Sequence, residues 1–128
     1  MEVREAVRSD FVEVHKLLLS VFPNAAANIG KGDGFFVAED SGLIGFAHFS
    51  EDRRKIVLRG LGVKENARER GAGGMLLDAL IARAKRGNKK IYLKARMGSP
   101  ALSLYKDKGF CVKRMNGETL TLVFRIGN

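Results

Sequence analysis

The segment from residue 68 to residue 74 combines residue types that are suited to binding a phosphate. Its sequence, Arg68-Glu69-Arg70-Gly71-Ala72-Gly73-Gly74, places three glycines in four residues where a helix is predicted to begin. Glycine inside a helix costs about 1 kcal/mol relative to alanine, so a backbone reason is needed. Without Cβ atoms, first-turn amides approach a pyrophosphate closely, and the helix dipole adds about half a positive charge. The alternative is a turn that only permits close packing.

Two other phosphate-binding motifs are excluded. A Walker loop needs Lys followed by Ser or Thr after its last glycine, and neither Gly30-Lys31 nor the 68–74 segment supplies them. A dinucleotide fingerprint would need glycine where Leu76 stands, and no acidic residue lies between 89 and 106 to bind a ribose. The anion is therefore expected to be neither a nucleotide at a P-loop nor a nicotinamide cofactor.

The elements that must position this segment follow from hydrophobic periodicity. Ser9 or Asp10 is predicted to cap a helix over 11–21, which Pro23 ends, and Glu13 completes a capping-box spacing with Asp10. A second helix is predicted from about Gly71 to Arg86, with Gly87 as its C′ residue. Strands are predicted at 1–6, 35–39, 43–50, 55–63, 89–95, 110–115 and 118–126, with a further helical turn at 25–29 and a short helix between 99 and 109. The order β-α-(α)-β-β-β-α-β-α-β-β predicts an α/β (α+β) fold with a mixed sheet and helices on both faces.

Composition narrows the class of protein. The 128 residues suit a single domain spanning 1–128, and one Cys with two His argues against a disulfide framework or a structural zinc site. The longest uncharged stretch, residues 17–30, is too short to span a bilayer, and charged residues stand where a signal peptide needs an apolar core. We therefore expect a cytoplasmic protein with no metal and no membrane partner. The net charge of +9 points to an anionic partner without identifying it.

Two motifs at the right separation resemble the GNAT superfamily of acetyl-coenzyme A-dependent N-acetyltransferases. The family signature Gln/Arg-x-x-Gly-x-Gly/Ala is matched from Arg68 to Gly73, and the element Ala-x-x-x-Tyr followed by Gly-Phe is matched by Ala101, Tyr105 and Gly109-Phe110. The opening Val3-Arg4-Glu5-Ala6, with Asp10 before the first helix, is also similar. The resemblance covers essentially the whole chain and implies a GNAT-like, mostly antiparallel sheet flanked by helices.

The resemblance also implies roles for particular residues. The backbone around Gly62, at Leu61 and Val63, would hold the pantetheine arm and acetyl carbonyl of acetyl-coenzyme A. The cofactor pyrophosphate would bind to Arg68, Glu69, Arg70, Gly71, Ala72, Gly73 and Gly74. Tyr105 would lie near the sulfur as a general acid. The leaving group is a thiolate whose thiol has a pKa near 8.5, so a nearby phenol can donate a hydrogen bond or a proton to it. A packed aromatic on an amphipathic helix is the alternative for Tyr105.

The chain departs from relatives at positions that matter for catalysis. Gly98 stands where many relatives have Asn, with Ser99 beside it as a substitute contact. Val57 and Leu93 occupy strand positions where some relatives place a catalytic glutamate, yet an ammonium must lose a proton before attack. No base is identified. His48 alternates with apolar residues and is interpreted as a packed side chain. The acids nearest the predicted acetyl site flank the strand at 55–63, and they are Glu51, Asp52 and Glu65.

The acceptor is predicted only as a class. Arg59 shares strand parity with Leu61 and Val63, so we expect it on the acceptor side, where it would favour an acceptor with a carboxylate or phosphate. The short loop 21–34 favours an open cleft for a primary amine of a small molecule, a peptide N-terminus or a lysine. Cys111 is predicted to be a buried structural thiol rather than an acyl carrier.

Three functions stay open at this level. The first is direct acetyl transfer from acetyl-coenzyme A to an amine, and the second is a coenzyme A-binding protein without catalysis. The third is a nucleic-acid-directed member acting on charged RNA, suggested by two basic clusters at 53–55 and 85–90. Such clusters more often form solvated faces, and interleaved aromatics are absent, so nucleic acid is not the favoured partner. A homodimer is also compatible with the sequence.

Overall fold

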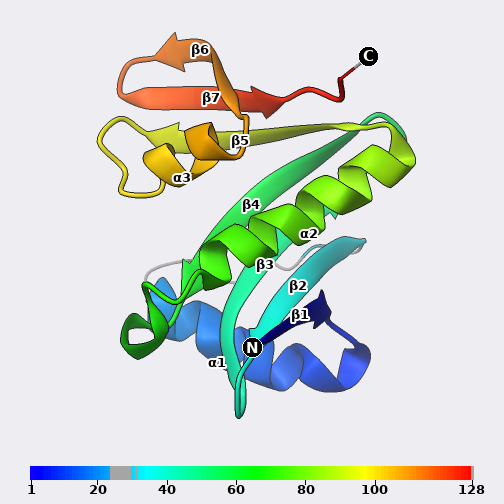
Figure 1. Cartoon of the computed structure of the whole chain (residues 1–128), viewed down its shortest axis with the longest axis vertical. Helices are drawn as coiled ribbons and strands as arrows, with labels where there is room; N and C mark the ends of the chain where they lie inside the picture. The colour runs from blue at the N-terminus through cyan, green and yellow to red at the C-terminus, as the bar shows by residue number, and fades with distance from the viewer. Residues whose placement is uncertain (24–29, 31, 128) are drawn as a thin grey trace.

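The computed structural model describes residues 1–23, 30 and 32–127. Within these residues, seven strands form one sheet in the order β1-β2-β3-β4-β5-β7-β6, in which only the β4–β5 pair is parallel (Figure 1). The strands are β1 (Glu2–Glu5), β2 (Asp33–Glu39), β3 (Leu43–Glu51), β4 (Lys55–Val63), β5 (Lys90–Arg96), β6 (Cys111–Asn116) and β7 (Thr119–Phe124). The α-helices are α1 (Phe11–Val21), α2 (Ala72–Gly87) and α3 (Leu102–Asp107), with short 3₁₀ turns at Arg8–Asp10 and Glu65–Ala67.

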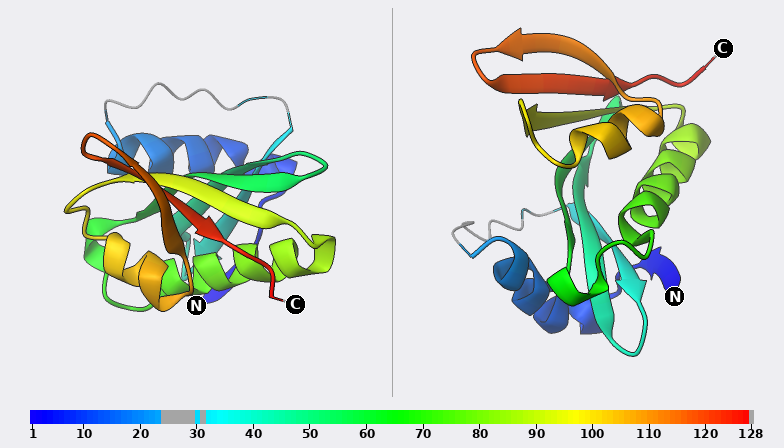
Figure 2. Two further views of the ribbon diagram at one scale, coloured as in Figure 1. Left: turned by 90° about the horizontal axis from the view of Figure 1, so that it is seen from above. Right: turned by 60° about the vertical axis from the view of Figure 1, so that its left-hand side comes forward.

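The sheet is covered on both faces. Helix α1 lies on one face, and α2 and α3 lie on the other (Figure 2). Two apolar clusters match these two layers. The cluster under α1 is built from buried residues that include Val14, Phe35 and Phe46. The larger cluster under α2 and α3 includes Leu76, Leu80, Ile91, Leu122 and Tyr105. The predicted mixed sheet with helices on both faces is confirmed.

Helix α2 forms where the apolar spacing predicts it. Leu76, Leu77, Leu80, Ile81 and Ala84 are buried, and they repeat at intervals that place them on one helical face. Its end differs slightly from the prediction. The left-handed residue that terminates α2 is Asn88, with φ 53°, and Gly87 is the last helical residue. Asparagine is the non-glycine residue that most readily adopts this conformation.

The predicted capping box before α1 is wrong. Asp10 makes no side-chain cap; its carboxylate accepts hydrogen bonds from the Arg4 guanidinium at 2.7 and 2.9 Å and from the Val7 amide at 2.7 Å. The Glu13 carboxylate accepts instead from the Leu43 amide at 2.9 Å. Both carboxylates thus bind groups outside α1, and the spacing of the two acids does not predict these partners. The helical turn predicted at 25–29 lies outside the described residues.

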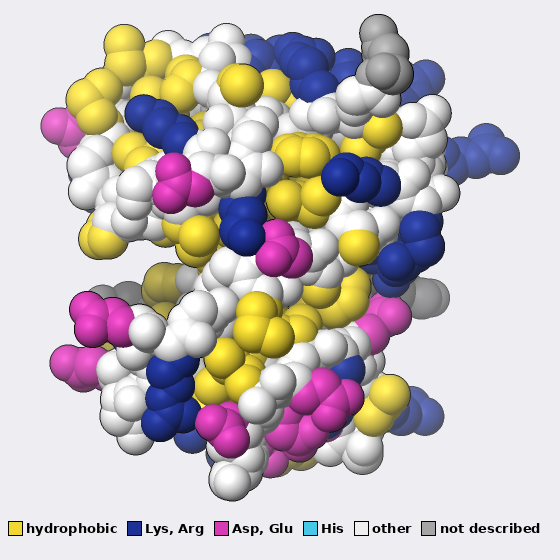
Figure 3. Space-filling model, viewed as in Figure 1, with side chains coloured by type: hydrophobic (Ala, Val, Ile, Leu, Met, Phe, Trp, Pro, Cys, Tyr) yellow, Lys and Arg dark blue, Asp and Glu magenta, His cyan; other side chains and the backbone are white. Residues whose placement is uncertain are grey.

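The feature of the fold that creates a site is the separation of β4 from β5. The two strands pair only from Lys55 with Lys90 to Leu58 with Leu93. Beyond these residues the main chain of β4 has no recorded pairing to β5 within the described structure, although its pairing to β3 continues to Val63. The space-filling view is deeply notched at the left, on the side where the strands separate (Figure 3). The open edge of β4 is therefore available to a ligand.

Candidate functional site

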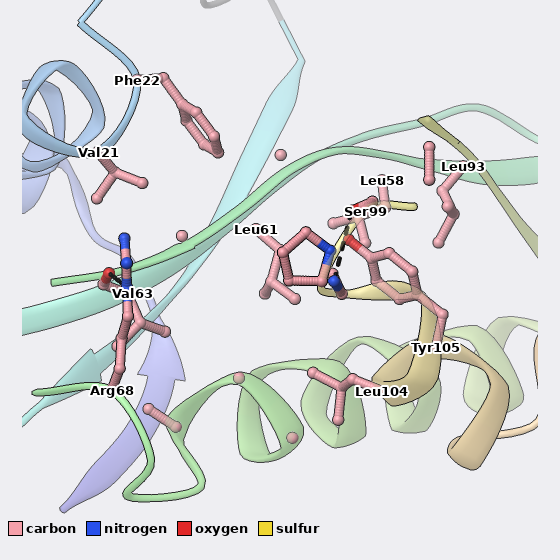
Figure 4. A pocket seen from close by; sticks show the side chains of 18 of the residues that line it. Val21, Phe22, Leu58, Leu61, Val63, Arg68, Leu93, Ser99, Leu104 and Tyr105 are labelled. Carbon is pink, nitrogen blue, oxygen red and sulfur yellow. Dashed lines mark hydrogen bonds between the residues drawn. The ribbon is translucent and has the colours of Figure 1, made fainter. Parts of the chain in front are cut away.

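A cleft of about 750 Å³ occupies the space between the separated strands. Its lining comes from both faces of the sheet. On one face, Val21 ends α1 and Phe22 comes directly after it. On the other face, the lining includes Gly73 of α2 and Leu104 and Tyr105 of α3. The close-up view shows Val21 and Phe22 on one side of the β4 ribbon and Leu104 and Tyr105 on the other (Figure 4). The cleft therefore passes through the sheet and can admit two reactants from opposite sides.

One side of the cleft is bounded by the beginning of α2. Gly71 is the N-cap residue with φ 84°, a left-handed conformation that glycine adopts without strain, and Glu69 is also left-handed at φ 68°. The amides of Ala72, Gly73 and Gly74 occupy the first turn, where a helix offers no acceptor for them. These residues line the cleft. The geometry thus provides main-chain donors at the positive end of a helix dipole, which suits an anion.

The three glycines at the start of α2 differ in what a side chain at each position would contact. A Cβ at Gly73 would lie 3.3 Å from Leu104 Cδ2, so this glycine lets α3 approach α2 closely. A Cβ at Gly74 would make only ordinary contacts, with Lys108 and Leu104, and one at Gly71 would meet nothing within 4 Å. The packing explanation therefore accounts for Gly73 in part, while the open space at Gly71 leaves room for a ligand.

The two arginines of the segment behave differently. Arg68 lines the cleft, and its Nε donates a hydrogen bond to the Val63 carbonyl oxygen at 3.1 Å. Arg70 does not line the cleft: its Nη1 lies 3.0 Å from Asp40 Oδ2 in the turn between β2 and β3. Only Arg68 is thus placed to supply the side-chain counter-charge expected from both residues, and Arg70 would contribute through its main chain.

The end of β4 forms the floor of the cleft. Leu61 and Val63 are half-buried, pack against the α2-side cluster and expose their main chain to the cleft. Gly62 lines the cleft from the other face of the strand, where a Cβ would come within 2.7 Å of Phe46 and 2.9 Å of Val21. Gly62 is therefore required for packing under α1, whatever its main chain binds.

Tyr105 projects from α3 into the cleft. Its side chain is buried, with its ring centroid 5.8 Å from that of Phe110, and it points toward Ser99 in the close-up view (Figure 4). Burial raises the pKa of the Tyr105 phenol above its ordinary value. The hydroxyl is therefore protonated at neutral pH, so it can donate a hydrogen bond or a proton. Tyr105 is thus both packed and part of the cleft lining, and its role as a general acid stays a prediction.

The structure corrects the expected orientation of Arg59. His48 of β3 pairs with Gly60 and Phe49 pairs with Leu58, so Arg59 is the extra residue of a β-bulge. Because the bulge reverses parity, Arg59 does not share the face of Leu61 and Val63. Its Nε instead donates to Ser50 Oγ at 3.1 Å on the α1 face, although the residue still lines the cleft.

A buried polar pair on the α1 face went unnoticed in the sequence. His48 Nε2 lies 2.7 Å from Asp33 Oδ2, and its ring stacks on Phe35 at 4.5 Å. Burial opposes ionisation of Asp33, but hydrogen bonds from His48 and the Gly30 amide outweigh it, so the pKa of this carboxyl is lowered. The packed interpretation of His48 agrees with this arrangement. Asp33 was missed because fifteen residues separate the partners, and only the register of β2 and β3 brings them together.

Other predicted positions lie at or beyond the rim. Ser99 lines the cleft, whereas Gly98 does not and adopts φ 84°.

The prediction of a buried thiol is wrong, because Cys111 is exposed on the edge strand β6, where every residue is exposed. Cys111 is also absent from the cleft lining, and so are the candidate acids Glu51, Asp52 and Glu65. Among described lining residues, Glu69 is the only carboxylate.

Neither a metal-binding cluster nor a membrane-spanning helix occurs among the described residues. No group of three or more His, Cys, Asp or Glu side chains in residues 1–23, 30 and 32–127 is arranged to hold a metal ion. Within the same residues, no helix has the length and apolar character needed to cross a bilayer.

Comparison with known proteins gives the family context. The profile of the family described as "Acetyltransferase (GNAT) domain" matches residues 31–112, which is more than half of the chain. No curated protein matches the chain significantly. Many solved structures share the fold. That of a GNAT family acetyltransferase from Elizabethkingia anophelis with acetyl-CoA bound is 18% identical, with a TM-score of 0.81 over 98% of this chain and 97% of that one.

Two further structures have the same fold. The ribosomal-protein-S18-alanine N-acetyltransferase from Escherichia coli is 15% identical, with a TM-score of 0.81 over 99% of this chain and 96% of that one. Aminoglycoside 6'-acetyltransferase type Ii is 17% identical, with a TM-score of 0.82 over 100% of this chain and 99% of that one. At these identities the likeness concerns the fold, and it spans the whole length of each protein.

Proposed function

This chain belongs to the GNAT acetyltransferase family, and from that premise we propose that it transfers an acetyl group from acetyl-coenzyme A to a primary amine. The observation on which the proposal rests is the cleft that passes through the sheet. It connects the amide-lined start of α2 to Tyr105 on one face and opens near Phe22 on the other. Such a cleft allows both substrates to bind together, which favours direct transfer over a covalent enzyme intermediate.

The residues of the cleft fit the proposed cofactor. The first-turn amides of α2 and the open space at Gly71 suit the pyrophosphate, with the Arg68 guanidinium beside them. The unpaired edge of β4, at Leu61 and Val63, offers main-chain groups to the amide-containing pantetheine arm. The Val63 carbonyl already accepts from Arg68, so Arg68 must release or share that acceptor if the arm uses it. A neighbour of the same fold was crystallised with acetyl-CoA bound, which supports this assignment.

The cofactor supplies a thioester whose carbon–sulfur bond is exchanged for a carbon–nitrogen bond to the amine. On this proposal, the buried phenol of Tyr105 gives its proton to the departing sulfur, because its raised pKa keeps it protonated at neutral pH. The amine must arrive without its own extra proton. Glu69, in the loop before α2, is the only carboxylate among the described lining residues, so the amine loses this proton to solvent before it attacks. Attack leaves a second surplus proton on the nitrogen. As the amide forms, that proton passes through water to the Tyr105 phenolate, which restores the phenol and yields one amide and one thiol.

The acceptor is proposed only as a class. The neighbours named for ribosomal protein S18 and for aminoglycosides indicate that this fold serves both peptide and small-molecule amines. Arg59 lines the cleft, is exposed, and bonds Ser50 on the α1 face. We therefore propose an acceptor that carries an anionic group near its amine.

The proposal is tested by measuring thiol release from acetyl-coenzyme A with a panel of amines that includes peptides, lysine, polyamines and aminoglycosides. Mass spectrometry of the acceptor must show the addition of one acetyl group for each thiol released. Coenzyme A binding without release for any amine would favour a binding protein that lacks catalysis. Absence of coenzyme A binding would contradict both functions.

A further inference from the structure

The end of the sheet opposite the cleft holds most of the chain's excess positive charge. We call residues 51–55, 83–90 and 124–126 the basic end. These residues include nine Lys or Arg and two Asp or Glu, which amounts to +7 of the net charge of +9. They are neighbours in the sheet, because Lys55 pairs with Lys90 between β4 and β5, and Ile91 pairs with Phe124 between β5 and β7. The two basic clusters of the sequence thus form one surface, to which Arg125 is added.

The two acids of the basic end are already occupied. Glu51 accepts from Arg83 Nε at 2.8 Å and from Lys89 Nζ at 2.7 Å. The Asp52 carboxylate accepts from the amides of Arg54 and Lys55 at 2.7 and 2.9 Å. Seven exposed cations remain, and none forms a salt bridge with a described residue: Arg53, Arg54, Lys55, Lys85, Arg86, Lys90 and Arg125.

The arrangement of these cations is extended. Lys55, Lys90 and Arg125 lie on or directly beside three adjacent strands, whose backbones are about 5 Å apart, so the row spans about 10 Å. The bend at 53–54 and the last turn of α2 at 85–86 lengthen the row. Dark-blue Lys and Arg side chains gather along the edge of the space-filling view where α2 ends and β5 begins (Figure 3). Helix α2 has 16 residues, so its first turn lies about 24 Å away, and the proposed cofactor site does not use these charges.

The surface chemistry favours a phosphate backbone over a protein partner. None of the large exposed apolar residues of the described structure belongs to the basic end. Protein interfaces are anchored by buried aromatic or apolar residues, whereas nucleic acid backbones are bound by Lys and Arg charge with release of counterions. We infer that the basic end is a docking surface for the phosphate backbone of a nucleic acid. Because it offers no exposed aromatic platform, it should bind without base preference.

The test measures binding of the full chain to a fluorescent single-stranded RNA of 20 mixed nucleotides by anisotropy between 50 and 200 mM NaCl. The variant Arg54→Gln/Lys55→Gln/Lys90→Gln removes three charges of the basic end. The matched control Arg8→Gln/Lys16→Gln/Lys106→Gln removes three exposed charges elsewhere. For the basic-end variant we expect affinity to fall between about tenfold and a hundredfold at 100 mM NaCl, and the slope of log affinity against log salt to drop by about 2. The control should lose less than about threefold.

Three results would overturn the inference: no binding of the unmodified chain at 100 mM NaCl, equal weakening by both triple variants, or equally tight binding of poly-glutamate of matched length. The last would assign the surface to an acidic protein segment. Thermal unfolding is recorded for each variant, and the single variants Lys55→Gln and Lys90→Gln should show smaller losses in the same direction. Thiol release with a small amine should stay unchanged in the basic-end variant, which separates this surface from the proposed catalytic cleft.

Discussion

The two ends of α2 offer two different ways of attracting an anion. At the N-terminal end, main-chain amides and glycines line a cleft, and one arginine side chain reaches into it. At the C-terminal end, seven exposed cations lie on a bend, on the last turn of α2 and at strand ends, and none of them lines the cleft. Backbone donors fix a small anion in one geometry, whereas flexible side chains hold an extended polyanion loosely. The number of basic residues in a segment therefore does not locate the phosphate site of an enzyme.

The largest change in the affinity for coenzyme A is expected when a negative charge is placed at the N-terminal end of α2 and compared with the same charge at its C-terminal end. Gly74→Glu adds a carboxylate to the first helical turn, where a Cβ makes only ordinary contacts and the charge would repel the cofactor pyrophosphate. We expect the affinity for coenzyme A, measured by isothermal titration calorimetry, to fall by about a hundredfold, because like charges in contact cost several kcal/mol. Gly87→Glu introduces the same side chain in the last turn, where a Cβ meets only the Lys89 side chain. Equal weakening by both variants would contradict the proposed cofactor site.

The next effect concerns Tyr105. Tyr105→Phe removes the proton donor while retaining the ring that packs near Phe110. We expect kcat for thiol release to fall between about a hundredfold and ten-thousandfold, in the range of general acid catalysis, with little change in KM for acetyl-coenzyme A. The control is Tyr92→Phe, a tyrosine on β5 whose ring lies under Lys113 rather than in the cleft lining. If both variants retained full kcat, the phenol would have no role in proton transfer.

The pH dependence of the reaction follows from the same site. Burial raises the pKa of Tyr105, so its phenol is protonated at neutral pH, where most of an acceptor amine still carries its extra proton. With no assigned protein base, kcat/KM for the acceptor should increase with pH until the pKa of that amine is reached. Amines of lower pKa should reach their plateau at lower pH. A plateau at one fixed pH for every amine would instead indicate a protein base.

A smaller effect is expected on the stability of the basic end. Burial opposes ionisation of Glu51, but hydrogen bonds from Lys89 and Arg83 outweigh it and lower the pKa of its carboxyl below the ordinary 4.5. The ionised group therefore stabilises the fold above about pH 4.5, and that contribution is lost as the pH falls through the lowered pKa. Glu51→Gln should reduce the free energy of unfolding by about 1–2 kcal/mol at pH 7 and by less at pH 3.

The matched control for Glu51 is Glu118→Gln. Glu118 bonds Arg96 at 3.1 Å, but both side chains are more than three-quarters exposed. Urea unfolding should show a change within about 0.5 kcal/mol for this variant. A Glu51 variant as stable as the Glu118 variant would mean that the ion pairs of the basic end contribute nothing to the fold.

The smallest effect is expected at the acceptor side. Arg59→Ala should raise KM for acceptors with a carboxylate or phosphate by a few-fold and leave KM for neutral amines unchanged, because the side chain is exposed and screened by water. Arg96→Ala, which removes an exposed charge from β5, serves as the control. An unchanged ratio of anionic to neutral acceptors in the Arg59 variant would remove this residue from acceptor recognition.

Sequence periodicity was sufficient for the elements but not for their irregularities. The buried spacing of Leu76, Leu77 and Leu80 defines α2, and the glycine segment before it does line the cleft. The bulge at Arg59 was not predictable, because period-two alternation assumes an unbroken ladder. The bond from Arg70 to Asp40 joins residues thirty positions apart, which only the fold brings together.

The exposure of Cys111 also depends on the fold and not on the local sequence. Apolar neighbours after Gly109-Phe110 suggested burial, but β6 is the edge strand and all of its residues are exposed. Sequence indicates that a segment is extended, whereas its place in the sheet order decides whether its side chains are covered. The same sheet order gathers the two basic clusters at one end, so neither cluster alone revealed the size of that surface.

On the proposed function, coenzyme A binds at the N-terminal end of α2 and not at the basic end. Titration of the isotopically labelled chain with coenzyme A, followed by amide NMR shifts, tests this residue by residue. We expect the largest shifts at the amides of 68–74 and along β4 at 61–63, with little change at 53–55 and 85–90. Largest shifts at 53–55 and 85–90, with 68–74 unaffected, would contradict this placement of coenzyme A.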